Sequence, residues 1–205
     1  MRPQNRKIYF IRKFLILVSV FVLCVGAISI PTTTEVVEED VTVIFPIESN
    51  IEIPYLQNDF VAFKEALAFK ESQGKYRVIN TLGYLGKYQF GKTTLERFRI
   101  YNTDHFLKNP ELQENAFLAY CKVNKWILRK DIKRSVGTII NGVEITESGI
   151  LAAAHLSGAG NVKKYLRTGG QHNLSDAYGA SISLYMKKFA GFDVSDIEAD
   201  RKARA

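Results

Sequence analysis

The chain has 205 residues, of which 46% are hydrophobic, 24% charged and 12% aromatic, with a formal net charge of +7. These fractions are typical of a globular protein and exclude a disordered or collagen-like chain. Two cysteines and three widely separated histidines are too few for a disulfide scaffold or a structural zinc site. We therefore expect a globular domain that holds no metal and needs no cofactor.

The charge is unevenly distributed along the chain. Residues 1–13 carry five basic groups and no acid, residues 14–30 carry no charge, and residues 31–59 carry seven acids and no base. The remaining segment, 60–205, has 23 basic residues and 14 acidic ones. Such a surplus favours an anionic partner, which is nucleic acid, a membrane surface or an acidic cell-wall polymer.

Residues 1–30 have the pattern of an export signal. The basic stretch leads into seventeen uncharged, mostly apolar residues that end in small ones, as a signal peptidase requires. An uncleaved anchor is the alternative, since seventeen residues lie at the short limit for spanning a bilayer. Lipidation of Cys24 is disfavoured by the bulky Leu23 before it. The rest of the chain is expected in the periplasm or cell envelope, either secreted or held at the inner membrane.

An acidic linker at 31–57 precedes a mainly helical domain at 58–192 and a polar tail at 193–205 that is expected to fray. The first helix is predicted from Asn58, as the N-cap, to a stop at Gly74. One face of this helix carries residues spaced by three, four and four, namely Phe60, Phe63, Leu67 and Glu71.

Later elements follow from capping and turn signals. The sequence Asn109-Pro110-Glu111 predicts the start of a helix that runs through Trp126. The pair Asn141-Gly142, between β-branched runs, predicts a hairpin with a two-residue turn. An apolar helix is predicted at 150–156. It is followed by a break at 158–160, a helix through residue 166, and a last helix from about 176 to 189. The fold class is mainly α with a small β-hairpin.

The segment 86–93 reads GKYQFGKT and matches the phosphate-loop pattern. That motif works only after a buried strand and before a helix. Residues 80–84 are instead typical of a turn, and Tyr88 and Phe90 would fill the space that phosphates need. We interpret the match as coincidence and predict no nucleotide site.

Glu71 is the most unusual residue of the first predicted helix. It lies on the apolar face and in the last turn, where the helix dipole opposes a negative charge. Both features disfavour its ionised form. A carboxylic acid kept protonated is what protonation of a leaving-group oxygen requires. The alternative is a carboxylate at the helix edge that pairs with a lysine such as Lys75.

Three motifs in order suggest a family. Glu71-Ser72 is followed by a G-x-x-G-x-x-Q segment at 83–89 and by AHLSGAG at 154–160. Together they resemble the lytic transglycosylase and goose-type lysozyme superfamily, and the eighteen-residue step from Glu71 to Gln89 agrees with its usual spacing. The resemblance covers residues 58–190 and implies an α+β, lysozyme-like fold.

The resemblance also implies functional residues. Glu71 would be the catalytic acid and then the base. Substrate-binding residues would be Ser72, Gly86, Tyr88, Gln89, His155, Ser157, Gly158 and Tyr185. His155 stands where the family usually has a tyrosine bonded to the catalytic glutamate, so it would donate a hydrogen bond to Glu71 or lie in the core. Tyr178 and Tyr185 would either stack on sugar rings or pack as helix residues.

The reaction implied is cleavage of the β-1,4 bond between N-acetylmuramic acid and N-acetylglucosamine in peptidoglycan strands. Attack by the sugar's own 6-hydroxyl would give a 1,6-anhydro product, as in a lytic transglycosylase. Attack by water would make the protein a lysozyme, with Asp176 or Asp104 as a second carboxylate. A peptidoglycan-binding module without catalysis is the other alternative. A nucleic-acid binder is disfavoured, because the basic residues are scattered and the chain carries an export signal.

Overall fold

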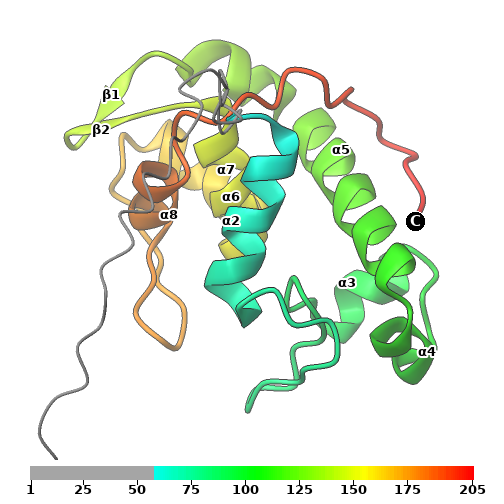
Figure 1. The fold of residues 1–205 in the computed structure, drawn as a ribbon. Helices are drawn as coiled ribbons and strands as arrows, with labels where there is room; N and C mark the ends of the chain where they lie inside the picture. The colour runs from blue at the N-terminus through cyan, green and yellow to red at the C-terminus, as the bar shows by residue number, and fades with distance from the viewer. Residues whose placement is uncertain (1–57) are drawn as a thin grey trace, which may run out of the picture. The chain divides into compact units, whose positions relative to one another are not determined.

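The computed structural model describes residues 58–205. The predicted export signal and acidic linker lie outside the described residues. Within them the chain forms seven helices and one two-stranded hairpin (Figure 1). The helices are α2 (Phe60–Ser72), α3 (Lys92–Arg97), α4 (Thr103–Lys108), α5 (Pro110–Ser135), α6 (Glu147–Ser157), α7 (Ala159–Arg167) and α8 (Ile182–Lys188). The strands are β1 (Ile139–Ile140) and β2 (Val143–Glu144). The predicted fold class, mainly α with a small hairpin, is confirmed for this part of the chain.

Helix α2 begins one residue later than predicted. Its N-cap is Asp59 rather than Asn58, because the Asp59 carboxylate accepts a hydrogen bond from the Ala62 amide at 2.9 Å. The helix ends at Ser72, and the two residues that follow, Gln73 and Gly74, both have positive φ angles. Glu71 therefore lies in the last turn, as the sequence predicts.

Helix α5 and the hairpin agree with their sequence signals. The Asn109 side chain accepts from the Leu112 amide at 3.0 Å, and Pro110 occupies the first helical position. The helix runs through Trp126, as predicted, and continues to Ser135. In the hairpin, Asn141 and Gly142 both have positive φ angles, 50° and 76°, as a two-residue type I′ turn requires.

The end of the domain departs from the prediction. The last helix starts at Ile182 instead of near Asp176, with Ser181 as its N-cap. The Asp176 carboxylate is used in a turn, where it accepts from the amides of Tyr178 and Ala180. A Ser175–Ser181 bridge closes the loop that contains this turn. The short helices α3 and α4 were not predicted.

The polar tail is packed rather than frayed. Val194, Ile197 and Ala203 are buried. The ammonium group of Lys125 on α5 donates to the Val194 carbonyl at 2.9 Å, and the Asp193 amide bonds to the Asn58 carbonyl. The tail therefore joins the two ends of the domain.

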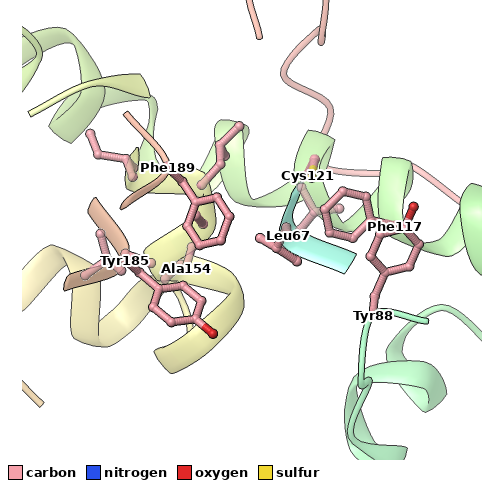
Figure 2. Packing of buried hydrophobic residues seen from close by; sticks show 14 of the residues in the cluster. Leu67, Tyr88, Phe117, Cys121, Ala154, Tyr185 and Phe189 are labelled. Carbon is pink, nitrogen blue, oxygen red and sulfur yellow. The ribbon is translucent and has the colours of Figure 1, made fainter. Parts of the chain in front are cut away.

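The core forms where α2, α5, α6 and α8 meet. Residues 150–154 of α6 are all buried, and this helix packs against α5, α7 and α8. The Tyr88 ring stacks on Phe117 with a centroid distance of 4.0 Å, and Leu67 of α2 is fully buried nearby (Figure 2). Tyr88 and Phe90 thus fill core space within the phosphate-loop pattern. Burial of α2 fixes the position of Glu71 at its C-terminal end.

No helix among residues 58–205 is both long enough and apolar enough to span a membrane.

Candidate active site

A pocket of about 290 Å³ lies at the C-terminal end of α2. Four segments form its walls: the last turn of α2, the loop at 80–89, the end of α6, and the turn at 176–178. The lining residues are Glu71, Asn80, Leu82, Tyr84, Gln89, His155, Leu156, Asp176, Ala177 and Tyr178. The first two segments are close in sequence and the other two lie far along the chain, and each brings at least one polar side chain.

Glu71 is half-buried in this pocket and is held by Tyr185 of α8. The Tyr185 hydroxyl donates to Oε1 of Glu71 at 2.8 Å. Burial raises the pKa of Tyr185, and the nearby Glu71 charge raises it further, so this hydroxyl stays a donor. Glu71 takes part in none of the ion pairs found among residues 58–205. The Lys75 ammonium, the alternative partner, bonds to Gln73 instead.

The loop at 80–89 is fixed by its own hydrogen bonds. The Asn80 side chain accepts from the amides of Leu82 and Tyr84 at 2.9 and 3.0 Å. Gln89 has a φ angle of 51°, and its side-chain amide donates to the Gly86 carbonyl at 2.8 Å. The loop therefore presents Tyr84 and Gln89 to the pocket without help from a ligand.

His155 lines the pocket from α6, but it does not bond to Glu71. Its Nε2 lies 2.8 Å from the Tyr88 carbonyl oxygen, which can only accept, so this nitrogen donates. Burial lowers the pKa of His155 against the opposing effects of the Glu71 charge and the Tyr88 bond. Of the two alternatives for His155, donation to Glu71 is not among the described contacts, and the aromatic rings packed on the imidazole fit the other, a place in the core. Tyr185 makes that bond, and no sequence signal marks a pair 114 residues apart.

The carboxylate of Asp176 faces the same pocket as Glu71. Its Oδ1 accepts from the amides of Tyr178 and Ala180 at 2.9 and 2.8 Å, which fixes its position. Tyr178 is two-thirds exposed, and its hydroxyl lies 3.0 Å from that of Thr81, so the two loops that border the pocket touch. Asp104 is exposed in the first turn of α4 and does not line the pocket.

Six residues predicted to bind substrate do not line the pocket, namely Ser72, Gly86, Tyr88, Ser157, Gly158 and Tyr185, the last of which reaches it only through its bond to Glu71. The Ser72 hydroxyl donates to the Lys87 carbonyl at 2.7 Å, and the Ser157 hydroxyl donates to the Ala153 carbonyl within α6. Tyr88 is fully buried in the core. Gly86 has a φ angle of 72° and packs so closely on Gln113 that a Cβ would collide with it. Gly158, with a φ angle of 78°, separates α6 from α7. These residues shape the fold, and a part for them in substrate binding stays a prediction.

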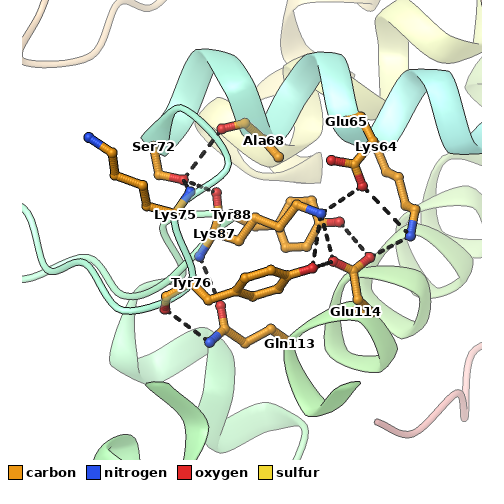
Figure 3. A network of polar contacts seen from close by, with 10 residues as sticks. All are labelled: Lys64, Glu65, Ala68, Ser72, Lys75, Tyr76, Lys87, Tyr88, Gln113 and Glu114. Atoms are coloured by element: carbon orange, nitrogen blue, oxygen red, sulfur yellow. Dashed lines mark hydrogen bonds and ion pairs between the residues drawn. The ribbon is translucent and has the colours of Figure 1, made fainter. Parts of the chain in front are cut away.

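A second polar cluster, which the sequence did not predict, lies beside α2 (Figure 3). The Lys87 ammonium, only 4% exposed, donates to Glu65 at 2.6 Å, to Glu114 at 2.8 Å and to the Tyr76 hydroxyl at 3.2 Å. Glu114 also accepts from three further donors, Lys64, Tyr76 and Tyr88. We call this cluster of Lys64, Glu65, Tyr76, Lys87, Tyr88 and Glu114 the Lys87 network.

The Lys87 network is an ionised cluster. Burial alone would lower the pKa of Lys87, but its bonds to Glu114 and Glu65 outweigh this effect and raise it above its ordinary value. Burial likewise raises the pKa of Glu114, yet the bonds from Lys64 and Lys87 dominate and lower it to about 2. Both groups therefore stay charged at neutral pH.

No family model, curated protein or solved structure matches this chain.

Proposed function

We propose that this chain is a peptidoglycan-cleaving enzyme that acts on the β-1,4 bond between N-acetylmuramic acid and N-acetylglucosamine. The observation that carries the proposal is the pocket that Glu71 shares with Gln89 and His155. Each of these residues comes from a different one of the three motifs that resemble the lytic transglycosylase and goose-type lysozyme superfamily. A chance match of three short motifs gives no reason for them to meet at one cavity.

In this proposal Glu71 acts first as an acid and then as a base. Its proton passes to the bridging oxygen as the glycosidic bond breaks and the ring becomes oxocarbenium-like. The carboxylate then removes a proton from the nucleophile. Tyr185 supports both steps, since its hydroxyl, 2.8 Å from Oε1, holds the carboxyl group in one orientation. The partly exposed rings of Tyr84 and Tyr178 at the pocket wall offer surfaces on which sugar rings would stack.

The identity of the nucleophile decides whether the enzyme is a lytic transglycosylase or a lysozyme. Attack by the sugar's own 6-hydroxyl needs no second carboxylate and gives the 1,6-anhydro product of a lytic transglycosylase, which is our first choice. A lysozyme-type hydrolase is the second candidate, because Asp176 faces the same pocket and would activate a water molecule. A peptidoglycan-binding module that lacks turnover is the remaining alternative.

Charge and export signal fit this substrate. The 23 bases and 14 acids in residues 60–205 would draw the domain to the anionic cell wall. The signal or anchor predicted at residues 1–30 would carry the domain out of the cytoplasm, to the periplasm or envelope. The linker at 31–57 would let an anchored domain reach the glycan strands.

The test is digestion of purified peptidoglycan by the full chain, followed by mass spectrometry of the soluble products. We expect 1,6-anhydro-muropeptides from the unchanged protein. Glu71→Gln should lower their yield roughly 10²- to 10⁴-fold, the usual contribution of a general acid–base group. Glu96→Gln is the matched control, because Glu96 is an exposed glutamate of α3 that does not line the pocket.

Two other outcomes of the digestion would change the conclusion. Muropeptides with reducing ends would establish a lysozyme and make Asp176→Asn the next variant. Intact binding to peptidoglycan without any soluble product, from a protein shown to be folded, would overturn the enzyme and leave the binding module.

A further inference from the structure

His155 carries an acceptor atom that has no partner within residues 58–205. Its Nε2 bears the proton, because the Tyr88 carbonyl to which it bonds has only lone pairs to offer. The other ring nitrogen, Nδ1, therefore holds a lone pair in the neutral ring. Among the described residues Nδ1 is buried and makes no hydrogen bond. A buried polar atom left without a partner costs free energy, so a role at this position is expected.

The surroundings of His155 favour the neutral ring. Three aromatic rings, those of Phe90, Phe117 and Tyr120, pack around the imidazole with centroid distances of 5.6 to 5.8 Å. The Tyr120 hydroxyl cannot serve Nδ1, since it donates to the Ala154 carbonyl at 2.8 Å. An imidazolium would need an acceptor at Nδ1, and burial lowers the pKa of His155.

Glu71 is the candidate donor for the unpaired Nδ1 of His155. The two residues line one pocket and interact electrostatically, yet no hydrogen bond or ion pair joins them among the described contacts. This is expected for an ionised carboxylate, which has no proton to give to a lone pair. A protonated Glu71 is different, because its carboxylic O–H has a proton to donate to a lone pair such as that of Nδ1.

We infer that His155 is a positioning residue that accepts a hydrogen bond from the protonated form of Glu71 and so holds the proposed acid ready for proton transfer. This inference rests on the proposed function. The titratable groups that line the pocket with Glu71 or bond to it come from each surrounding element: His155 from α6, Tyr185 from α8, Asp176 and Tyr178 from the turn, and Tyr84 from the loop. Of these, the His155 Nδ1 is the group that favours the protonated over the ionised carboxyl through an acceptor contact.

Two isosteric substitutions test the roles of the two ring nitrogens of His155 separately. In His155→Gln the side-chain amide reaches the Nε2 position and keeps a donor for the Tyr88 carbonyl, but the acceptor at Nδ1 is lost. In His155→Asn the side-chain oxygen keeps an acceptor near the Nδ1 position, but the bond to Tyr88 is lost. Measurements are thermal unfolding of the full chain and the pH profile of kcat/KM on purified peptidoglycan.

We expect His155→Gln to unfold near the temperature of the unchanged protein but to lose activity on the alkaline side, because the acid form of Glu71 is no longer favoured. The alkaline limb of its kcat/KM profile should be roughly tenfold lower than that of the unchanged protein. His155→Asn should unfold earlier but keep the limb in place. An unchanged profile in a folded His155→Gln protein would overturn the inference.

A second measurement does not depend on turnover. Long-range ¹H–¹⁵N NMR of the full chain reports the tautomer of His155, and ¹³C NMR of the Glu71 carboxyl reports its protonation. We expect the Nε2–H tautomer, and a change of the Nδ1 resonance in step with the titration of Glu71 that is absent in Glu71→Gln. A proton on Nδ1, or an Nδ1 signal indifferent to Glu71, would overturn the inference. If the coupling is present and peptidoglycan stays intact, the proposed function alone fails.

Discussion

Two polar clusters flank helix α2, and they differ in how fully their hydrogen bonds are satisfied. In the Lys87 network, Glu114 accepts from four donors and the Lys87 ammonium donates to three acceptors. In the pocket, Glu71 accepts a single bond from Tyr185, and Nδ1 of His155 has no partner among the described residues. Each cluster contains a glutamate of α2, Glu65 in the network and Glu71 in the pocket, so residue type alone does not separate them.

The difference indicates which cluster holds the fold and which is free to act on a ligand. A network in which most donors and acceptors are paired has few left to offer, and its buried charges are balanced inside the protein. An unsaturated pocket has bonds still to make. One loop serves both: Lys87 and Tyr88 enter the network, while Tyr84 and Gln89 face the pocket. The network therefore fixes the wall of the pocket.

Removal of the central cation is the strongest way to test this division. Lys87→Met should destabilise the domain by about 3 kcal/mol, because Glu114 would keep its burial but lose a buried ionic partner. For a domain of this size the melting temperature should fall by roughly 6–12 °C, measured by thermal unfolding. Glu96→Gln, at an exposed site, is the control and should leave it within about 2 °C. An unchanged melting temperature for Lys87→Met would contradict a structural role for the network.

Acid should destabilise the domain through Glu114, whose ionised form is held by the Lys87 network. The pKa of Glu114 is lowered from an ordinary 4.5 to about 2 by Lys64 and Lys87, against the effect of burial. A lowered pKa gives stability that is present above pH 4.5 and is lost as the pH falls toward 2. The loss should be on the order of 3 kcal/mol, measured by urea unfolding at several pH values.

Comparison of one variant with the unchanged protein assigns that loss to a residue. Glu114→Gln should start less stable at pH 7 and show a flatter dependence between pH 4.5 and 2. His155, whose pKa is lowered by burial, contributes a separate loss that begins as the pH falls below about 6.5, and this step should persist in Glu114→Gln. Equal slopes in the two proteins below pH 4.5 would place the acid sensitivity outside the network.

The sequence predicted local features better than contacts between distant segments. Caps and turns depend on neighbouring residues, so the start of α5 at Asn109 and the turn at Asn141-Gly142 were both predicted correctly. The start of α8 was missed because Asp176 can cap a helix or form a turn, and only the closing bridge to Ser181 decides between them. The tail was read as frayed because its few apolar residues, such as Val194, show no periodicity.

In the candidate site, too, the sequence predicted a local feature and missed the contacts between distant segments. Glu71 was singled out because an acid interrupts an apolar face, which is a local signal, and the structure puts it in a pocket. The bond from Tyr185 and the Lys87 network join residues from 11 to 114 positions apart, and no spacing rule predicts such pairs. The motif positions Ser72 and Tyr88 were assigned by resemblance to substrate binding, but their hydroxyl groups bond within the protein.

The smallest expected effect comes from Ser72, which follows Glu71 directly in the chain. A change at Ser72 separates a role in the fold from a role in substrate binding. Its hydroxyl donates to the Lys87 carbonyl at 2.7 Å and accepts from the Lys75 amide at 3.0 Å, so it ties the end of α2 to the loop. Ser72→Ala should therefore cost about 1 kcal/mol of stability. The KM for peptidoglycan should not change, and urea unfolding and steady-state kinetics check the two values. Ser157→Ala is the matched control, since its hydroxyl bonds only within α6 and its loss should cost less. A raised KM with unchanged stability would move Ser72 from the fold to the substrate, and would mean that satisfied hydrogen bonds do not separate the two regions.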